Sequence, residues 1–202
     1  MKKGINRALN NISKSLNESV KFASKNKPCV FLSHRSLDKD MVEEIGKYIM
    51  KAGLDIYLDK YDEELQRADK GKNDKLITEC MQKGISESTH IMCLLSPNTI
   101  NSWWVPYEIG YADKSVDIEI CSLKLKELPD NSIPSYIKIN KCLKGIPELN
   151  GYLIEILIRY NNTIIKSFSK YQDDQYEHFE EASIIQESYL YHPLSKYLDI
   201  ES

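Results

Sequence analysis

Short apolar runs that alternate with longer segments of helical period constrain the fold of this chain most. The clearest run is Ile91–Leu95, five consecutive apolar residues that suit a strand covered on both faces of a sheet. Helix-period segments separate this run from the others, as crossover connections between parallel strands require. We therefore predict an α/β domain with a five-stranded parallel sheet and helices on both faces. The other predicted strands are Cys29–Leu32, Asp55–Asp59, Ile118–Leu125 and Tyr136–Ile139.

Apolar side chains at helical spacing predict the helices between these strands. Asp38 is a plausible N-cap for the first, and Gly53 suits the positive φ at its C-terminal end. The stretch from Lys60 to Lys75 is too polar for a core and long for a connection in an α/β domain. The predicted helices centre on residues 41–50, 76–85, 103–113 and 147–167.

Charge divides the chain into three parts. The formal net charge is only −3, but residues 1–27 carry seven basic residues against one acidic residue. Residues 171–202 carry eight acidic residues against one basic residue. We therefore expect a basic N-terminal segment (1–27), a central domain (28–170) and an acidic, tyrosine-rich C-terminal extension (171–202). The small net charge gives no reason to expect a nucleic-acid partner.

Both terminal segments have apolar residues to bury. The N-terminal ones recur at spacings of three and four, which predicts an amphipathic helix that packs on its own domain or on a sister subunit. A helix on a membrane surface is the less favoured alternative. We expect the C-terminal extension to be helical, and both segments to fold onto the domain away from the carboxyl ends of the strands. The apolar residues are Ile5, Leu9, Ile12, Leu16 and Val20 in the first segment, and Phe179, Ile184, Ile185, Tyr189 and Leu190 in the second.

The cellular compartment is inferred from what the sequence lacks. No apolar run approaches the roughly 20 residues that span a bilayer, and no signal-peptide core follows Met1. The five cysteines are an odd number and are scattered singly along the chain. We therefore expect a cytoplasmic protein without disulfides.

Ligands of an open parallel sheet bind at the carboxyl ends of the strands, so the residues after each strand are the candidates. These residues lack the glycine pattern of a dinucleotide fold, a P-loop, the acidic residues of a phosphate receiver and a serine-hydrolase elbow. The four histidines have no second type of metal ligand within helical reach, so we expect no metal. Cys29 and Cys93 are interpreted as buried hydrophobic residues.

The segment SWWVPYEIGYA, Ser102–Ala112, follows the central strand directly. Glu108 lies four residues after Trp104, which places an indole and a carboxylate on the same helical face. The alternative is that Trp103 and Trp104 belong to the core while Glu108 is solvated.

Three motifs in order, CVFLSHRSLDKD, GLDIYLD and HIMCLLSPNTINSWWVPYEIGYA, resemble the Toll/interleukin-1 receptor (TIR) domain of stand-alone bacterial proteins. The resemblance covers Cys29 to about Ser167 and implies a flavodoxin-like fold, in which Asp59–Lys75 forms the BB loop. It also implies cleavage of NAD⁺ at the nicotinamide–ribose bond, with Glu108 as the catalytic carboxylate. NAD⁺ is then the substrate, and no cofactor is expected. The tryptophan pair stands where many members have tryptophan and cysteine.

The expected substrate-binding residues lie after the first three strands. An indole of Trp103 or Trp104 would stack on an aromatic ring of the substrate, and His34 and Arg35 could face its pyrophosphate. For His34 and Arg35 a solvated loop is equally compatible with the sequence. The full set of expected substrate-binding residues is Ser33, His34, Arg35, Asp59, Trp103 and Trp104.

Two functions of different class fit the resemblance. The favoured one is an NAD⁺-consuming enzyme of antiphage defence of the Thoeris type, releasing ADP-ribose or a cyclic ADP-ribose isomer that signals to a downstream effector. The alternative is a non-catalytic scaffold that acts by TIR–TIR assembly. Glu108 favours the enzyme, because scaffold members commonly lack this glutamate. Self-association through TIR–TIR contacts is expected in either case.

Overall fold

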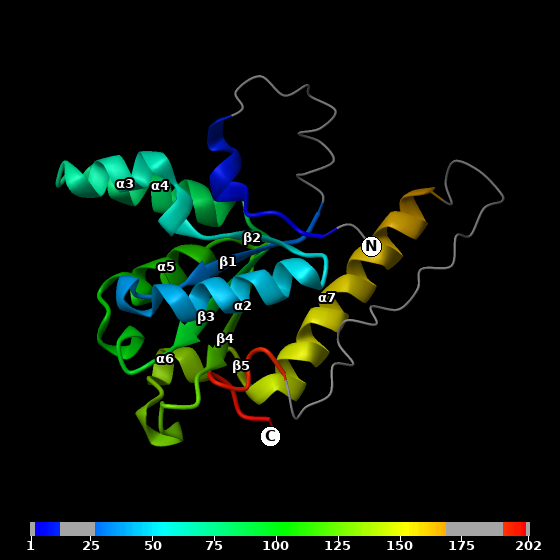
Figure 1. Cartoon of the computed structure of the whole chain (residues 1–202). Coiled ribbons are helices and arrows are strands. Elements are labelled where there is room, and N and C mark those ends of the chain that lie inside the picture. The colour runs from blue at the N-terminus through cyan, green and yellow to red at the C-terminus, as the bar shows by residue number, and fades with distance from the viewer. Residues whose placement is uncertain (1–2, 13–26, 169–191, 201–202) are drawn as a thin grey trace.

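A parallel five-stranded sheet in the order β2-β1-β3-β4-β5 forms the centre of the molecule, which confirms the predicted fold class (Figure 1). The computed structural model describes residues 3–12, 27–168 and 192–200. The strands are β1 (Cys29–Ser33), β2 (Asp55–Tyr57), β3 (His90–Leu95), β4 (Glu119–Lys124) and β5 (Lys141–Lys144). The α-helices are α2 (Lys39–Lys51), α3 (Glu63–Lys70), α4 (Asp74–Ser86), α5 (Trp104–Asp113), α6 (Ser135–Lys138) and α7 (Gly145–Phe168). The 3₁₀ helices are η1 (Arg7–Ile12), η2 (Ser36–Asp38), η3 (Asp59–Tyr61), η4 (Thr99–Asn101) and η5 (Asp130–Ser132).

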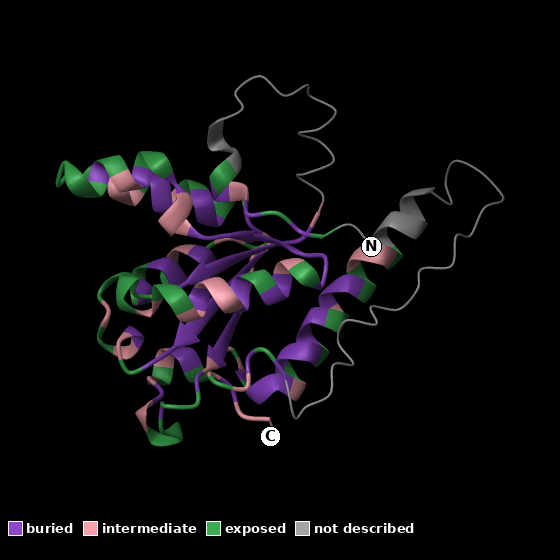
Figure 2. Ribbon diagram, viewed as in Figure 1, coloured by how far each residue is buried: buried purple, intermediate pink, exposed green. Residues whose placement is uncertain are grey.

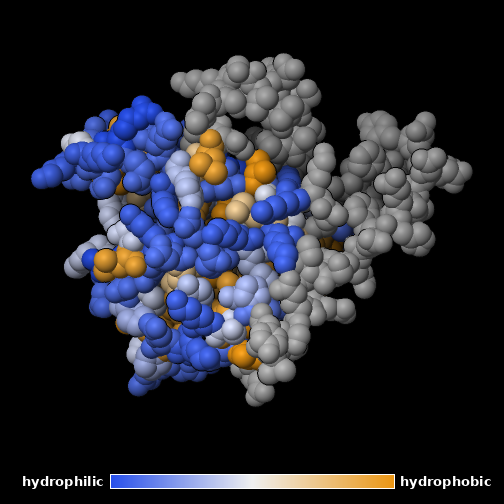
Figure 3. Space-filling view, viewed as in Figure 1, coloured by the Kyte–Doolittle hydropathy of each residue, from blue (hydrophilic) through white to orange (hydrophobic). Residues whose placement is uncertain are grey.

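Alternate residues of each strand face opposite layers of helices. Val30 and Leu32 of β1 join a core cluster with α2 and α7, whereas Phe31 belongs to a cluster with α4 and α5. A third cluster joins β3 to α5 and α6. The inner strands β1 and β3 are therefore buried along their whole length, which explains why their sequences are nearly continuous apolar runs (Figure 2). The outer face of α2 is hydrophilic (Figure 3).

The last strand lies later in the chain than predicted. Residues 135–138 form helix α6 and not the expected strand, and β5 is Lys141–Lys144. Pro134 begins the helical turn, because its carbonyl accepts a hydrogen bond from the N–H of Ile137. An edge strand needs few apolar residues, and Leu143 is the buried residue of β5. The apolar residues before it therefore drew the strand prediction to the wrong segment.

The charged stretch after β2 folds into a helix that we did not predict. Asp62 caps α3, since its carboxylate accepts hydrogen bonds from the N–H groups of Glu64 and Leu65. Leu65 and Ala68 are buried, and Leu65 packs against α4. The length of this connection is thus explained by one amphipathic helix rather than by an exposed loop.

The prediction of an N-terminal helix is wrong for its first residues, which do not form a helix. Gly4–Asn6 instead run beside β2, where the carbonyl of Ile5 accepts a hydrogen bond from the N–H of Ile56 at 2.9 Å. Ile5 and Leu9, expected on a buried face, are 45% and 50% exposed. We call residues 4–8 the N-terminal strap. The rest of the expected helix beyond η1, residues 13–26, lies outside the described residues.

Buried Asp55 anchors the N-terminal strap to β2. Its carboxylate forms ion pairs with Arg7 at 3.2 Å and with Lys27 at 2.7 Å, and accepts a hydrogen bond from the N–H of Ile5. Gly4 lies so close to β2 that a Cβ at this position would be 1.7 Å from the carbonyl oxygen of Leu54. The strap is therefore a fitted element of the domain.

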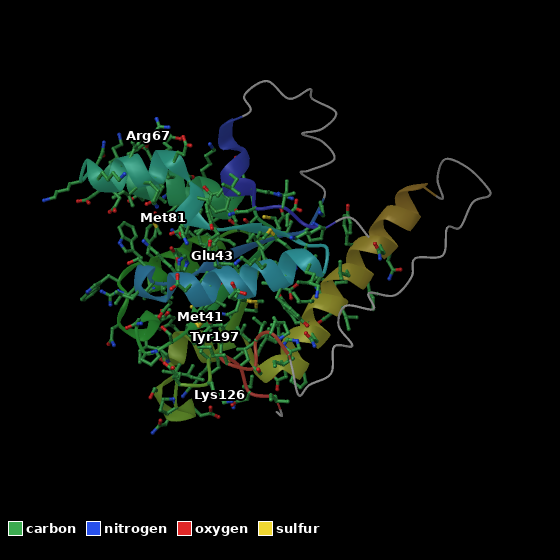
Figure 4. All side chains as sticks on the ribbon, viewed as in Figure 1. Met41, Glu43, Arg67, Met81, Lys126 and Tyr197 are labelled. Atoms are coloured by element: carbon green, nitrogen blue, oxygen red, sulfur yellow. The ribbon has the colours of Figure 1, made fainter. Side chains whose placement is uncertain are left out.

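The end of the chain also packs into the domain, at a place that contradicts our expectation. Residues 192–200, which we call the C-terminal clasp, form turns rather than a helix and bury Leu194 and Leu198 in the core cluster of α2 and α7. The carbonyl of Tyr197 accepts from Lys126 N–H, just after β4 (Figure 4). The clasp thus lies at the carboxyl ends of strands, not away from them. Residues 169–191, with the apolar side chains expected to anchor the extension, lie outside the described residues.

Two further contacts fix the C-terminal clasp. Gly145 has a φ of 73°, a conformation that favours glycine. The position also has no room for a side chain, because a Cβ here would be 2.7 Å from the carbonyl oxygen of Asp199. Buried His192 contacts the hydroxyl of Tyr48 through Nε2 at 3.0 Å, and that hydroxyl donates to Asn150.

In the part of the chain that the structure describes, no helix has the length and apolarity needed to cross a membrane.

Candidate active site

A cavity of about 400 Å³ opens at the carboxyl ends of β1 and β2, beside the N-terminal half of α5. It collects residues from the loops after these strands and from helices α2, α3, α4 and α5. Six of the seven expected site residues line it, namely His34, Arg35, Asp59, Trp103, Trp104 and Glu108. The topology therefore brings the loop after β1 next to helix α5, although the two lie far apart in the chain.

Glu108 occupies a position on the buried stripe of α5. Val105, Ile109 and Ala112 are the other buried residues of this helix, so the carboxyl group projects from a helix face that is otherwise apolar. Burial raises the pKa of Glu108 to about 8, a hydrogen bond from Ser33 opposes this, and the nearby Asp59 carboxylate adds to it. A carboxyl with such a pKa changes its charge close to neutral pH.

Ser33 lies against Glu108 and does not line the cavity wall. It is the last residue of β1, is fully buried, and its hydroxyl donates a hydrogen bond to Oε2 of Glu108. The sequence placed Ser33 after a strand with no means of telling which way its hydroxyl points. The structure separates it from the other expected substrate-binding residues.

His34 and Asp59 lie next to each other at the edge of the cavity. Nδ1 of His34 is 2.9 Å from the carbonyl oxygen of Leu32, which requires a proton on Nδ1. Nε2 is 3.7 Å from Oδ1 of Asp59. The imidazole is buried and held on both sides, so the solvated-loop alternative does not describe His34.

Cationic side chains surround the outer part of the cavity. Arg35 and Lys39 come from the segment after β1, and Lys39 begins helix α2. Lys60 follows β2 and forms an ion pair with Glu43 at 3.1 Å. The cavity also carries the carboxylates of Asp59 and Asp69, but its guanidinium and ammonium groups are donors that an anionic ligand such as a pyrophosphate can use.

The two tryptophans differ in their surroundings. Trp103 is 93% exposed, whereas Trp104 is 40% exposed and meets Tyr107 edge to face, with ring centroids 5.9 Å apart. The Tyr107 hydroxyl accepts a hydrogen bond from Gln82 of α4 at 2.6 Å. The Trp104 indole thus packs against Tyr107 of its own helix, which Gln82 of α4 holds in place. The alternative of two core tryptophans with a solvated Glu108 does not hold.

Sequence reasoning missed the contribution of α3 and α4 to the cavity. Asp62 before the lone apolar Leu65 was the available signal for α3, but the surrounding charges masked it. Gln66 of this helix donates to the carbonyl of Asp59 at 3.4 Å and so connects α3 to the cavity edge. The missed lining residues from these two helices are Leu65, Gln66, Asp69, Ile77 and Met81, the last labelled in Figure 4.

A second cavity, of about 390 Å³, lies beside the ends of β3 and β4 and contains none of the expected site residues. Met41 and Tyr197 contribute to its wall (Figure 4). Asp38 accepts hydrogen bonds from Ser96 at 2.6 Å and from Asn98 at 2.7 Å, and so ties the loop after β1 to the loop after β3. The carboxylate of Asp38 therefore has a structural role, since both of its oxygens accept hydrogen bonds from the loop after β3.

Among the described residues, no group of three or more His, Cys, Asp or Glu side chains could hold a metal ion. The first cavity instead offers the buried carboxyl of Glu108, three cations, the carboxylates of Asp59 and Asp69, and an exposed aromatic wall. Such a set can bind a flat, charged, phosphate-bearing molecule and place a single carboxylate beside it.

Comparison with known proteins adds independent information. The family described as TIR domain matches residues 30–142. The chain is 34% identical over 119 residues to a Staphylococcus aureus protein named NAD(+) hydrolase TirS, which covers 57% of this chain and 38% of that protein. It is 29% identical over 109 residues to a Bacillus cereus protein named "Probable 3' cyclic ADP-D-ribose synthase ThsB'", over 54% of each chain. The chain thus matches little more than a third and about half of these two relatives.

Proposed function

This chain belongs to the TIR domain family, and on that premise we propose that it cleaves the bond between nicotinamide and ribose in NAD⁺. The observation that carries the proposal is the buried carboxyl of Glu108, which faces a cavity of about 400 Å³ lined by cations and indoles. The names of the two relatives support the same substrate, because one is named as an NAD⁺ hydrolase and the other as a probable synthase of a cyclic ADP-ribose.

One carboxylate is sufficient for this reaction. Ordinary glycoside hydrolysis needs a second carboxyl as acid, because an alkoxide is a poor leaving group. Nicotinamide leaves as a neutral molecule, so no proton has to be supplied. The ionised Glu108 would accept hydrogen bonds from the ribose hydroxyls and oppose the positive charge that develops on the ribose.

The cavity suggests an orientation for the rest of the substrate. Arg35, Lys39 and Lys60 would bind the pyrophosphate, and Trp104, with its edge fixed by Tyr107, would stack on an aromatic ring. NAD⁺ is the substrate in this scheme, and no further cofactor takes part.

The finer functional proposal concerns the product. Attack by water on the ribose gives ADP-ribose, and attack by another group of the same molecule gives a cyclic isomer. We propose that the product serves as an immune signal in bacterial antiphage defence, acting on a downstream effector in the cytoplasm. The relative named as a cyclic ADP-ribose synthase supports the cyclic product, and the one named as a hydrolase supports the linear one.

The direct test is incubation of the purified protein with NAD⁺, followed by chromatographic separation of the products. Release of nicotinamide with ADP-ribose or a cyclic isomer supports the proposal, and the product ratio identifies the reaction. An intact NAD⁺ pool with folded protein, across dilute and concentrated samples, would favour the scaffold function.

The rate of cleavage should fall as the pH decreases below about 8. Burial raises the pKa of Glu108 to about 8, and only the ionised form opposes the developing positive charge. We expect kcat/KM for NAD⁺ to rise about tenfold per pH unit on the acid side and then to level off. Initial rates with enzyme-free blanks at each pH measure this. A profile flat from about pH 6 to 9 would contradict an essential carboxylate with this pKa.

We also propose that activity depends on self-association through the exposed face of α3, as TIR domains generally self-associate. Arg67 is exposed there and forms an i,i+4 ion pair with Glu63, which contributes little to stability. Arg67→Glu should lower specific activity several-fold at fixed protein concentration without changing the melting temperature. Lys114→Glu, an exposed charge reversal at the end of α5, is the matched control. Constant specific activity on dilution, with an unchanged Arg67→Glu variant, would place the complete site in one chain.

A further inference from the structure

The ionised carboxyl that the reaction needs lies in an unfavourable place. Glu108 is fully buried on the apolar stripe of α5, and Asp59 adds a second negative charge nearby. Both features favour the protonated form, which has no charge to offer the substrate. Some group in the site must favour the ionised form and fix its direction.

Ser33 is the described residue that donates a hydrogen bond to this carboxyl. It sits at the end of β1, between β2 and β3 in the sheet, with its Cα in register with that of Cys93. Because this pairing with β3 holds the backbone at Ser33, the sheet sets the position of the hydroxyl. Its hydrogen bond goes to Oε2 of Glu108, so Oε1 stays available to the cavity.

The other charged and titratable groups around Glu108 do not replace this contact. Cys93 of β3 lies opposite Ser33 in the sheet, and burial raises the pKa of its thiol, which therefore stays neutral. Asp59 follows β2, with Oδ1 3.7 Å from Nε2 of His34. Asp69 of α3 and the cations Arg35, Lys39 and Lys60 line the same cavity, where a bound pyrophosphate would compete for the cations.

We propose that Ser33 is a positioning residue, which fixes the Glu108 carboxylate and favours its ionised form, and that it does not bind the substrate. This inference rests on the proposed cleavage of NAD⁺. It changes the role expected of Ser33 from the sequence, and it makes the end of β1 part of the reaction machinery although the cavity does not reach it.

The test compares Ser33→Ala with wild type by kcat, KM and pH profile for NAD⁺. Loss of a hydrogen bond to a charged group should lower kcat about tenfold, leave KM within about twofold, and move the acid limb about one pH unit higher. Ser33→Cys keeps the size of the side chain but is a weaker donor, and should lie between the two. The cysteine variant also serves if the alanine variant does not fold.

Ser122→Ala provides a matched control. Ser122 is a buried serine of β4, which β3 separates from β1, and its hydroxyl has no hydrogen-bond partner among the described residues. Its loss should leave kcat, KM and the pH profile unchanged. An altered pH limb in Ser122→Ala would show that any buried serine change disturbs the sheet, and would overturn the assignment to Ser33.

A second measurement does not depend on turnover. The difference in melting temperature between wild type and Glu108→Gln should change with pH around the pKa of Glu108. In the Ser33→Ala background the same change should occur at a higher pH. Wild-type protein that shows this shift but no NAD⁺ cleavage would refute the proposed function while upholding the Ser33–Glu108 pairing. Cleavage with an unshifted limb in Ser33→Ala, or a raised KM alone, would overturn the positioning role.

Discussion

Glu108→Gln should remove NAD⁺ cleavage and leave the fold intact. The amide keeps the shape of the side chain and can still accept the hydrogen bond from Ser33, but it has no charge to oppose the developing positive charge on ribose. We expect kcat to fall at least about 100-fold, as when a major electrostatic contact is removed from a transition state. Nicotinamide release, measured beside circular dichroism of the same sample, checks both parts.

The same substitution should change stability in a direction set by pH. The pKa of Glu108 is raised from 4.5 to about 8, so the folded protein binds the proton more tightly than the unfolded chain. The resulting stabilisation is fully present below pH 4.5 and is lost as the pH rises through about 8. The side chain of the glutamine variant does not titrate in this range. Between pH 4.5 and about 8 its free energy of unfolding should therefore rise, relative to that of wild type, by on the order of a few kcal/mol.

Glu79→Gln is the control for both measurements. Glu79 is an exposed carboxylate on α4, close to the cavity in the chain but outside its lining, with a loose ion pair to Lys75 at 3.8 Å. It should cleave NAD⁺ at the wild-type rate and melt like wild type. Wild-type turnover in Glu108→Gln would refute the proposed mechanism, and equal losses in both variants would show a general effect on the helices.

Truncation of a leucine in the C-terminal clasp should destabilise the whole domain. Leu194 and Leu198 are fully buried among residues of α2 and α7, although they follow a long segment that is rich in charge. Leu198→Ala removes buried methyl groups and leaves a cavity, at a cost of about 2–5 kcal/mol in the free energy of unfolding. Urea denaturation of the full chain measures this, and the double variant with Leu194→Ala should lose more.

The matched control for the clasp is Val116→Ala, because Val116 is a fully exposed apolar side chain in the described chain. It should change the free energy of unfolding by less than about 0.5 kcal/mol. Wild-type stability in Leu198→Ala would mean that residues 192–200 do not contribute to the core. The C-terminal extension would then be separable from the domain.

The parts of the fold that the sequence predicts are those where burial is strongest. Ile91–Leu95 is covered on both faces of the sheet, so its apolar run carries a clear strand signal. Two of the errors lie at the edges of the sheet, where burial is weak. Lys141–Lys144 has one buried side chain, and Ile5 and Leu9 matched a helical period that backbone pairing with β2 overrides at Gly4–Asn6.

The candidate site follows the same logic. Glu108 and Trp104 are recognisable because they follow the central strand and lie one helical turn apart, so local spacing is sufficient to predict a shared wall. The contributions of α3 and α4 depend on how these helices pack against residues that lie far away in the sequence, such as those of α5. Local spacing does not encode such contacts. The direction of the Ser33 hydroxyl depends on strand register, which decides the face of every side chain.

The N-terminal strap has a consequence for how copies of this protein can meet. A free outer strand exposes unpaired N–H and carbonyl groups, and is a template for joining sheets of two molecules. At β2 the strap already occupies part of this row of groups, and at β5 the edge is short and carries the exposed ion pairs of Lys141 and Lys144 instead of apolar side chains. Growth into a continuous intermolecular sheet is therefore disfavoured at both borders. Association is left to the helices and loops, including those that surround Glu108.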